Sequence, residues 1–234
     1  MLTYFDYNKM GRGQHGWLDS HFHFSFAEYF NPDNIQFGVL RVVNDDRVAP
    51  GTGFDTHPHR DMEIISYVVE GELTHEDSMK NKRTLTRGQV QYMSAGTGIF
   101  HSEHNLGDKL LRFLQIWILP DQKGYEPNYG DHLFEWRERT DKWLPVASGD
   151  DSSPAPIRIH ADVNIYAAEI TGGGELSLPV SAGRQAYLVL IEGAAQIAGY
   201  ALSAGDALAI TEENVRVTAK DTAHILAVEM ERSR

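Results

Sequence analysis

The 234-residue sequence contains no cysteine. Disulfide bonds, zinc–thiolate sites, iron–sulfur clusters and thiol nucleophiles are therefore excluded together, and any metal must be bound through nitrogen and oxygen atoms. The sequence also has no apolar run of about 18 residues or more, which a transmembrane helix needs. Its first residues, MLTYFDYNKM, lack the basic start and apolar stretch of a signal peptide. We therefore expect a cytoplasmic protein that does not interact with a membrane.

Clusters of lysine and arginine are absent as well. The formal net charge is −12 at pH 7, which would repel a polyphosphate backbone. The one modest basic group, Lys80, Lys82 and Arg83, lies in an expected turn, where solvated charges are usual. Direct binding to nucleic acid is therefore disfavoured.

Two pairs of metal-ligating residue types are present, His57 with His59 and His101 with Glu103. Within each pair the spacing is i, i+2, and such residues project from the same face of a β-strand. If the two segments are neighbouring strands, three imidazoles and one carboxylate converge on one point. That set suits a first-row divalent metal such as iron.

A single HxH pair is weak evidence, because the chain has eleven histidines and such pairs arise easily by chance. We interpret the pair His21 and His23 as structural or surface residues, since no matching carboxylate pair accompanies them. We give the same interpretation to a further set: His75, His104, His132, His160 and His224. Of these, we expect His75 to lie nearest the mouth of the first barrel.

Short segments rich in β-branched and aromatic residues alternate with Gly, Asn and Asp, a pattern typical of a sandwich or barrel. The first series comprises residues 37–43, 51–54, 63–69, 88–93 and 111–119. The second series begins near Ile157 and includes residues 165–170, 186–191, 194–197, 207–210 and 224–229. The chain is therefore expected to be all-β and to contain two similar units.

An internal duplication is indicated by the similarity of residues 67–71 (YVVEG) to residues 187–193 (YLVLIEG). The second copy has neither an HxH nor an HxE pair in the matching places, so we expect metal only in the first. The small, polar segment 147–156 is typical of a linker or a long exposed loop. Residues 134–139 are interpreted either as a helical turn or as part of the connection.

Three sequence blocks resemble the pirin family of two-domain cupins, over most of the first 120 residues. They are HGWLDS with FSFA near the start, GFDTHPHRDME, and MSAGTGIFHSE. His57, His59, Glu63 and His101 also fill the general cupin pattern. The resemblance implies two tandem cupin barrels of the double-stranded β-helix or jelly-roll type, with domains at 1–140 and 141–234 and metal only in the N-terminal one.

The resemblance implies that Glu103 supplies the carboxylate ligand and that Glu63 supports the site. Strand parity alone leaves both open, because residues 57, 59, 61 and 63 share one face of a regular strand. The chain departs from the usual bacterial pirin pattern at His21-Phe22-His23, so no role is carried over to that block. We expect one divalent transition metal per chain, with Fe(II) as the first choice and two coordination positions left for a substrate oxygen and dioxygen.

Pirins resemble quercetinases in activity as well as fold. The resemblance therefore implies a quercetin 2,3-dioxygenase, which opens the central ring of a flavonol and releases carbon monoxide, with Glu103 as the catalytic base that accepts the substrate hydroxyl proton. Planar aromatic rings could be held by five apolar residues that core packing would equally demand: Phe54, Met93, Ile99, Phe113 and Trp117.

Two alternatives stay open. One is a non-enzymatic, metal- and redox-dependent regulatory module of the pirin type, whose acidic surface would permit docking on a basic protein partner. The other is a cupin that acts on a different small molecule.

Overall fold

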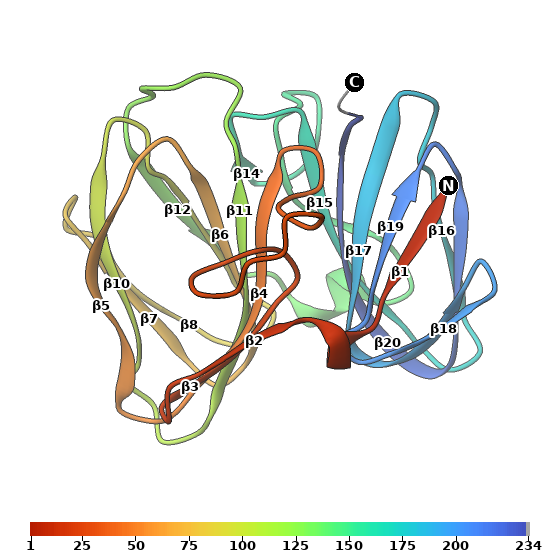
Figure 1. Ribbon diagram of the computed structural model, residues 1–234, viewed down its shortest axis with the longest axis horizontal. Coiled ribbons are helices and arrows are strands. Elements are labelled where there is room, and N and C mark those ends of the chain that lie inside the picture. The colour runs from red at the N-terminus through yellow and green to blue at the C-terminus, as the bar shows by residue number, and fades with distance from the viewer. Residues whose placement is uncertain (233–234) are drawn as a thin grey trace. The chain divides into compact units, whose positions relative to one another are not determined.

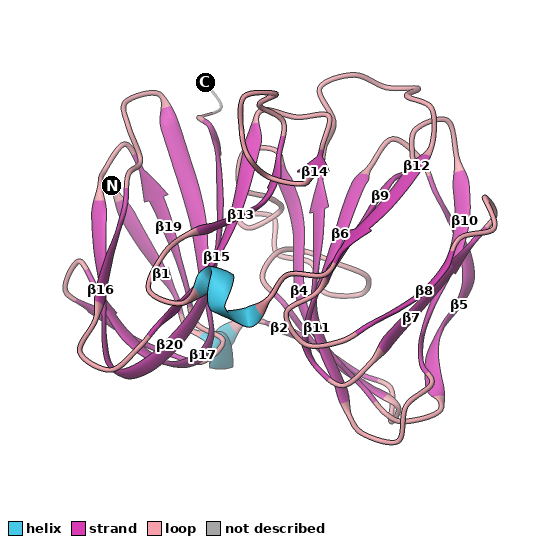
Figure 2. Cartoon of the chain, turned by 180° about the vertical axis from the view of Figure 1, so that it is seen from behind, coloured by secondary structure: helices cyan, strands magenta, loops and turns pink. Residues whose placement is uncertain are grey.

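The computed structural model describes residues 1–232, which consist almost wholly of β-strands. Helical structure within this range is limited to two single turns, η1 at Tyr7–Lys9 and η2 at Trp136–Arg139 (Figure 2). Of the two interpretations given for residues 134–139, the structure thus confirms the helical turn, which is a 3₁₀ turn. Within residues 1–232, none of the helices has the length and apolar character needed to cross a bilayer.

The chain forms two compact units, which are named here by the position of most of their residues. The N-terminal unit comprises Gly11–Phe134 and Ile159–Ala161, and the C-terminal unit comprises Met1–Met10, Glu135–Arg158 and Asp162–Arg234. The polar segment at residues 147–156 completes one strand and forms a turn inside the C-terminal unit. The domain boundary after residue 140 stays a prediction.

The N-terminal unit contains two antiparallel sheets (Figure 1). The first has the order β5-β10-β7-β8, with the strands Thr52–His59, Ile99–Asn105, Leu73–Asp77 and Lys82–Leu85. The second has the order β12-β9-β6-β11-β4-β3-β2, with the strands Asn128–His132, Val90–Ser94, Glu63–Glu70, Leu111–Ile118, Leu40–Val48, Leu18–Phe22 and Gly11–Gln14. All five strands of the first predicted series are present, as β4, β5, β6, β9 and β11.

The interior of the N-terminal unit is apolar because alternate residues of its strands project inward. In one cluster, Leu73 and Leu85 from the first sheet pack with Val68, Leu111 and Phe113 from the second. This burial removes apolar surface from water and so holds the two sheets together. The strands that carry the two predicted ligand pairs, β5 and β10, are thereby held against the second sheet.

The C-terminal unit is one antiparallel sheet except for a short parallel pair between β13 and β14. Its order is β1-β19-β17-β20-β15-β13-β14, with the strands Leu2–Phe5, Ala207–Thr211, Arg184–Ile197, Val215–Glu231, Val163–Ile170, Leu144–Ser148 and Ile157–Arg158. Two further strands pair with the long ones, β16 (Glu175–Leu178) with β20 and β18 (Tyr200–Ser203) with β17. Alternate residues of β17 and β20, among them Leu188, Leu190, Ile225 and Ala227, form its core.

Candidate metal centre

The two predicted ligand pairs lie on hydrogen-bonded neighbouring strands, because β5 and β10 pair with His57 opposite His101. The Nε2 atoms of these two histidines are 3.1 Å apart. One ligand nitrogen from each of His57, His59 and His101 lies within 4.8 Å of the others. Three imidazoles therefore converge as the i, i+2 spacing predicts.

Glu103 lies two residues beyond His101 on β10 and so on the same face, and the pairing of β10 with β7 is regular at both residues. On its other side β10 pairs with β5, where the register shifts between His101 and Glu103 and Glu103 lies opposite Phe54. The extra residue is on β5, between Phe54 and His57, and β-bulges commonly occur beside functional sites. The strands approach closely at Gly53, where an added Cβ would lie 2.4 Å from the Glu103 carbonyl oxygen.

The histidines are held in the form that binds metals. Nδ1 of His57 is 2.7 Å from the Asp55 carbonyl oxygen, which can only accept, so this nitrogen carries the proton and Nε2 keeps its lone pair. Burial, together with the neighbouring histidines, lowers the pKa of His59 to about 4 and that of His101 to about 3. Both rings are thus neutral at pH 7, as metal ligation requires.

The Glu103 carboxylate is held by three donors from the second sheet. Ser66 Oγ and Gln91 Nε2 donate to Oε1 at 2.8 and 2.5 Å, and Gln115 Nε2 donates to Oε2 at 2.6 Å. These contacts orient a carboxylate that is only 2% exposed. The sequence interpretation missed all three donors. Their signal is a polar residue inside an otherwise apolar strand, as in EIISYVVE and LRFLQIWI.

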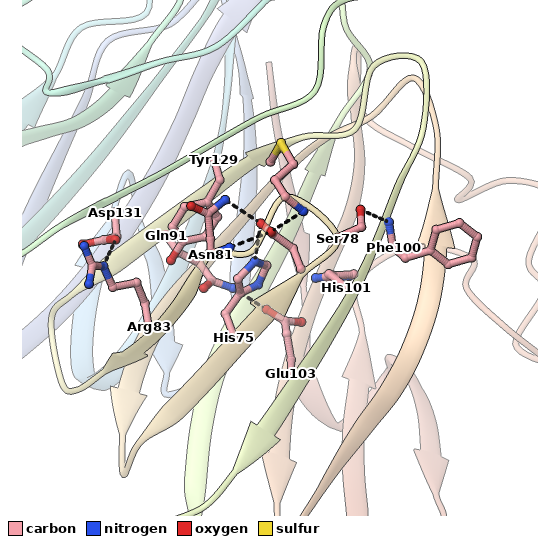
Figure 3. Close-up of polar contacts among 12 residues, drawn as sticks. His75, Ser78, Asn81, Arg83, Gln91, Phe100, His101, Glu103, Tyr129 and Asp131 are labelled. Atoms are coloured by element: carbon pink, nitrogen blue, oxygen red, sulfur yellow. Dashed lines mark hydrogen bonds and ion pairs between the residues drawn. The ribbon is translucent and has the colours of Figure 1, made fainter.

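His75 is a further residue that the sequence interpretation did not assign to the site. It lies opposite Glu103 in the pairing of β10 with β7, and it is fully buried rather than at the barrel mouth. Its Nε2 is 3.1 Å from Asp77 Oδ2, and its ligand atom lies within 4.8 Å of those of His101 and Glu103. Figure 3 shows His75, His101 and Glu103 converging from the adjacent strands β7 and β10.

Glu63 belongs to neither group of converging ligand atoms within residues 1–232. Its carboxylate instead accepts hydrogen bonds from Tyr92 Oη at 2.8 Å, Ser94 Oγ at 2.6 Å and the His160 backbone nitrogen at 3.1 Å. The His160 ring stacks on Tyr125 at a centroid distance of 3.8 Å. Glu63 therefore anchors Ile159–Ala161 to the N-terminal unit.

The remaining histidines lie outside the converging groups in the described part of the chain. His23 is buried, which lowers its pKa to about 4, and His21 is half-buried. In the C-terminal unit, His224 Nδ1 is 2.8 Å from Glu192 Oε2, and its ring packs against Trp136. Within residues 1–232, groups of three or more ligand atoms occur only in the N-terminal unit.

A cavity of about 610 Å³ opens beside the histidines and Glu103. Its aromatic lining consists of Trp17, Phe22, Phe26, Phe54 and Trp117. Two of the five predicted ring-binding residues, Phe54 and Trp117, are thus at the cavity, whereas Met93, Ile99 and Phe113 belong to core clusters. The cavity has the size and largely apolar lining of a small-molecule site.

One further acid, Asp46, lines this cavity. Burial, together with the charges of Asp45 and Glu103, raises its pKa to about 7 against the opposing effect of the hydrogen bond from Ser20. The sequence interpretation did not single it out. Its signal is the run Asn44-Asp45-Asp46 inside a strand, where turn residues are not expected.

The donor set suits a divalent metal ion. His57 Nε2 and His101 Nε2 face each other across 3.1 Å, and His101 Nδ1 is buried without a hydrogen-bond partner in residues 1–232. Three neutral imidazoles and one carboxylate are ligands that iron, nickel, copper and zinc all accept. A bound cation would take the lone pairs of both Nε2 atoms in place of the His57–His101 hydrogen bond.

Comparison with known proteins shows similarity over both units. The pirin family matches residues 6–118, and the quercetinase C-terminal cupin domain matches residues 145–230. The chain is 42% identical to a pirin-like protein of Caulobacter vibrioides, covering 95% of this chain and 97% of that protein. It is 40% identical to the quercetin 2,3-dioxygenase of Escherichia coli, covering 88% of each. The structure of the bacterial pirin YhhW from Escherichia coli in complex with nickel(II) has a TM-score of 0.93 at 36% identity, covering all of both chains.

Proposed function

The chain belongs to the pirin family, and on that premise we propose that it is a metal-dependent dioxygenase that opens the central ring of a flavonol such as quercetin with release of carbon monoxide. The observation that carries the proposal is the convergence of His57 and His59 with His101, which also lies close to Glu103, beside an aromatic cavity that His57, His59 and Glu103 line. The quercetin 2,3-dioxygenase name of the Escherichia coli relative supports this substrate class. We expect the reaction to take place in the cytoplasm.

We assign the ligands as His57, His59, His101 and Glu103, and the ion as Fe(II), one per chain in the N-terminal unit only. When bound, the metal supplies Lewis acidity and an electron path between substrate and dioxygen. The chain's own contribution is to hold the ligands in place. Ser66, Gln91 and Gln115 orient the glutamate from the facing sheet.

Glu103 is also the proposed catalytic base, because its carboxylate lines the cavity. There it accepts the proton of the flavonol hydroxyl at hydrogen-bonding distance. Trp117 and Phe54 flank the substrate rings and exclude water from the reacting atoms.

The test is oxygen uptake by anaerobically Fe(II)-loaded protein on addition of quercetin, with carbon monoxide measured in the headspace. We expect uptake and carbon monoxide from the wild type and from His21→Ala, whose changed residue lies outside the ligand groups, and none from His101→Ala. An iron-replete wild type that consumes no oxygen would reject the flavonol dioxygenase and favour the regulatory module or another substrate.

A further inference from the structure

Residues of β3 and β4 add further polar side chains to the cavity lining, among them Ser20 and Asp46. Neighbouring residues on a strand point to opposite faces. Asp45 accordingly pairs with Arg112 through two hydrogen bonds of 2.9 and 2.8 Å, whereas Asp46 lines the cavity. Asp46 lies opposite Ser20 in the pairing of β3 with β4, and Ser20 Oγ donates to its Oδ1.

Asp46 is short of partners for a buried carboxylate. It is 4% exposed, and among residues 1–232 Ser20 is the only residue that hydrogen-bonds its side chain. Asp45 has an arginine partner and Glu103 has three donors, but Asp46 has neither in the described part of the chain. Burying an acid with one hydrogen bond is costly, and a donor brought by a ligand would offset that cost.

The surroundings indicate which chemical group fits. Asn44 and Gln115 add neutral amides to the lining near Asp46, and Phe22 adds an aromatic ring. A negatively charged group would be repelled by Asp46 and Glu103 together. A hydroxyl can donate to the Asp46 carboxylate, and a hydrogen bond to an ionised acceptor is stronger than one to a neutral oxygen.

We propose that Asp46 and Ser20 form a second subsite of this cavity, which hydrogen-bonds a hydroxyl on the substrate other than the one that faces the metal ligands. The inference rests on the proposed function and narrows its substrate class to polyhydroxylated flavonols. The aromatic side chains of the cavity contact the flavonol rings. Glu103 and the histidines bind the hydroxyl at the reacting ring, and Asp46 hydrogen-bonds a second hydroxyl.

The test compares two ligands that differ in the required group. Quercetin carries several hydroxyls, whereas 3-hydroxyflavone carries only the one at the reacting ring. Their affinities for Ni(II)-loaded protein are measured by calorimetry without oxygen, so that binding is read separately from turnover. The variants are Asp46→Asn, which is isosteric, and Ser20→Ala. The matched control is Asp19→Asn, which removes a charge beside Ser20 on β3, from a residue that pairs with Arg12 and does not line the cavity.

We expect Asp46→Asn to weaken quercetin binding about five- to tenfold, because a neutral amide oxygen replaces a charged acceptor, and to change 3-hydroxyflavone binding less than about twofold. Ser20→Ala should act in the same direction, and Asp19→Asn should change neither affinity. If Asp46→Asn does not fold, as judged by circular dichroism and nickel content, Ser20→Ala alone decides. Equal effects on both ligands, or no effect on quercetin, would overturn the subsite.

The outcomes separate the two proposals. If the wild type binds neither flavonol, the substrate class fails and the subsite fails with it. If quercetin affinity falls selectively in the variants but the Fe(II) protein consumes no oxygen, the subsite stands and the dioxygenase reaction is rejected.

Discussion

At the residue scale, hydrogen bonding sets the position of the ring proton in one proposed ligand, and burial keeps two others uncharged. The Asp55 carbonyl fixes the proton of His57 on Nδ1, and burial lowers the pKa of His59 and His101. At His59 and His101 a metal therefore meets lone pairs without first displacing protons at neutral pH. The spacing along the chain predicted that the two residues of each ligand pair share a strand face, but burial in the folded protein lowers the pKa of His59 and His101.

At the residue scale, we predict that His101→Ala abolishes metal binding while the fold is retained, because it removes the ring that faces both His57 and His59. His21→Ala should keep the metal, since His21 belongs to neither ligand group within residues 1–232. The measurement is metal content by mass spectrometry after loading with Fe(II), with circular dichroism as the check on folding. Full iron occupancy in His101→Ala would show that the ion binds elsewhere.

At the scale of elements, the centre depends on how closely β5 approaches β10. The contact at Gly53 brings the backbones of β5 and β10 together beside Glu103. The facing sheet then supplies the donors to Glu103 from β6, β9 and β11. The site is thus built from two sheets rather than from one pair of strands.

We predict that Gly53→Ala weakens metal binding about tenfold or more, because the added methyl would collide with the backbone at Glu103 and His104 and force β5 away. Overpacking of this kind also destabilises a fold by about 1–3 kcal/mol. The matched control is Gly130→Ala on β12, where an added Cβ meets no atom within 4 Å. Metal titration followed by calorimetry measures the affinities. Unchanged metal binding in Gly53→Ala would show that the close approach of β5 and β10 at Gly53 is not needed for the metal centre.

At the scale of the whole molecule, the two units share an all-β architecture but differ in their ligating residues. The N-terminal unit gathers the three histidines and Glu103, with His75 beside them. In the C-terminal unit, His224 is paired with Glu192 and covered by Trp136. The same all-β architecture therefore carries a candidate metal centre in one unit and none in the described part of the other, because the ligands are supplied by particular side chains and not by the fold.

We predict one tightly bound divalent metal per chain. The C-terminal unit lacks a third ligand atom close to His224 and Glu192 in the part that the structure describes, and two ligands hold a transition metal weakly. Native mass spectrometry of the Fe(II)-loaded or Ni(II)-loaded protein counts the ions. A second ion that stays bound in His101→Ala would contradict the assignment of metal to the N-terminal unit alone.

The sequence by itself determined the all-β class, the two similar units and the shared face of each ligand pair, because covalent spacing places residues i and i+2 on one face of a strand. The pairing of β5 with β10, which brings the two pairs together, belongs to the tertiary structure. The tertiary structure decided what those ligands meet. Gln91 and Gln115 lie on other strands from Glu103, and only the packing of the sheets brings them to it. The same packing buries Asp46 in the cavity with Ser20 as its partner. These contacts join residues far apart in sequence, and local spacing carries no information about them.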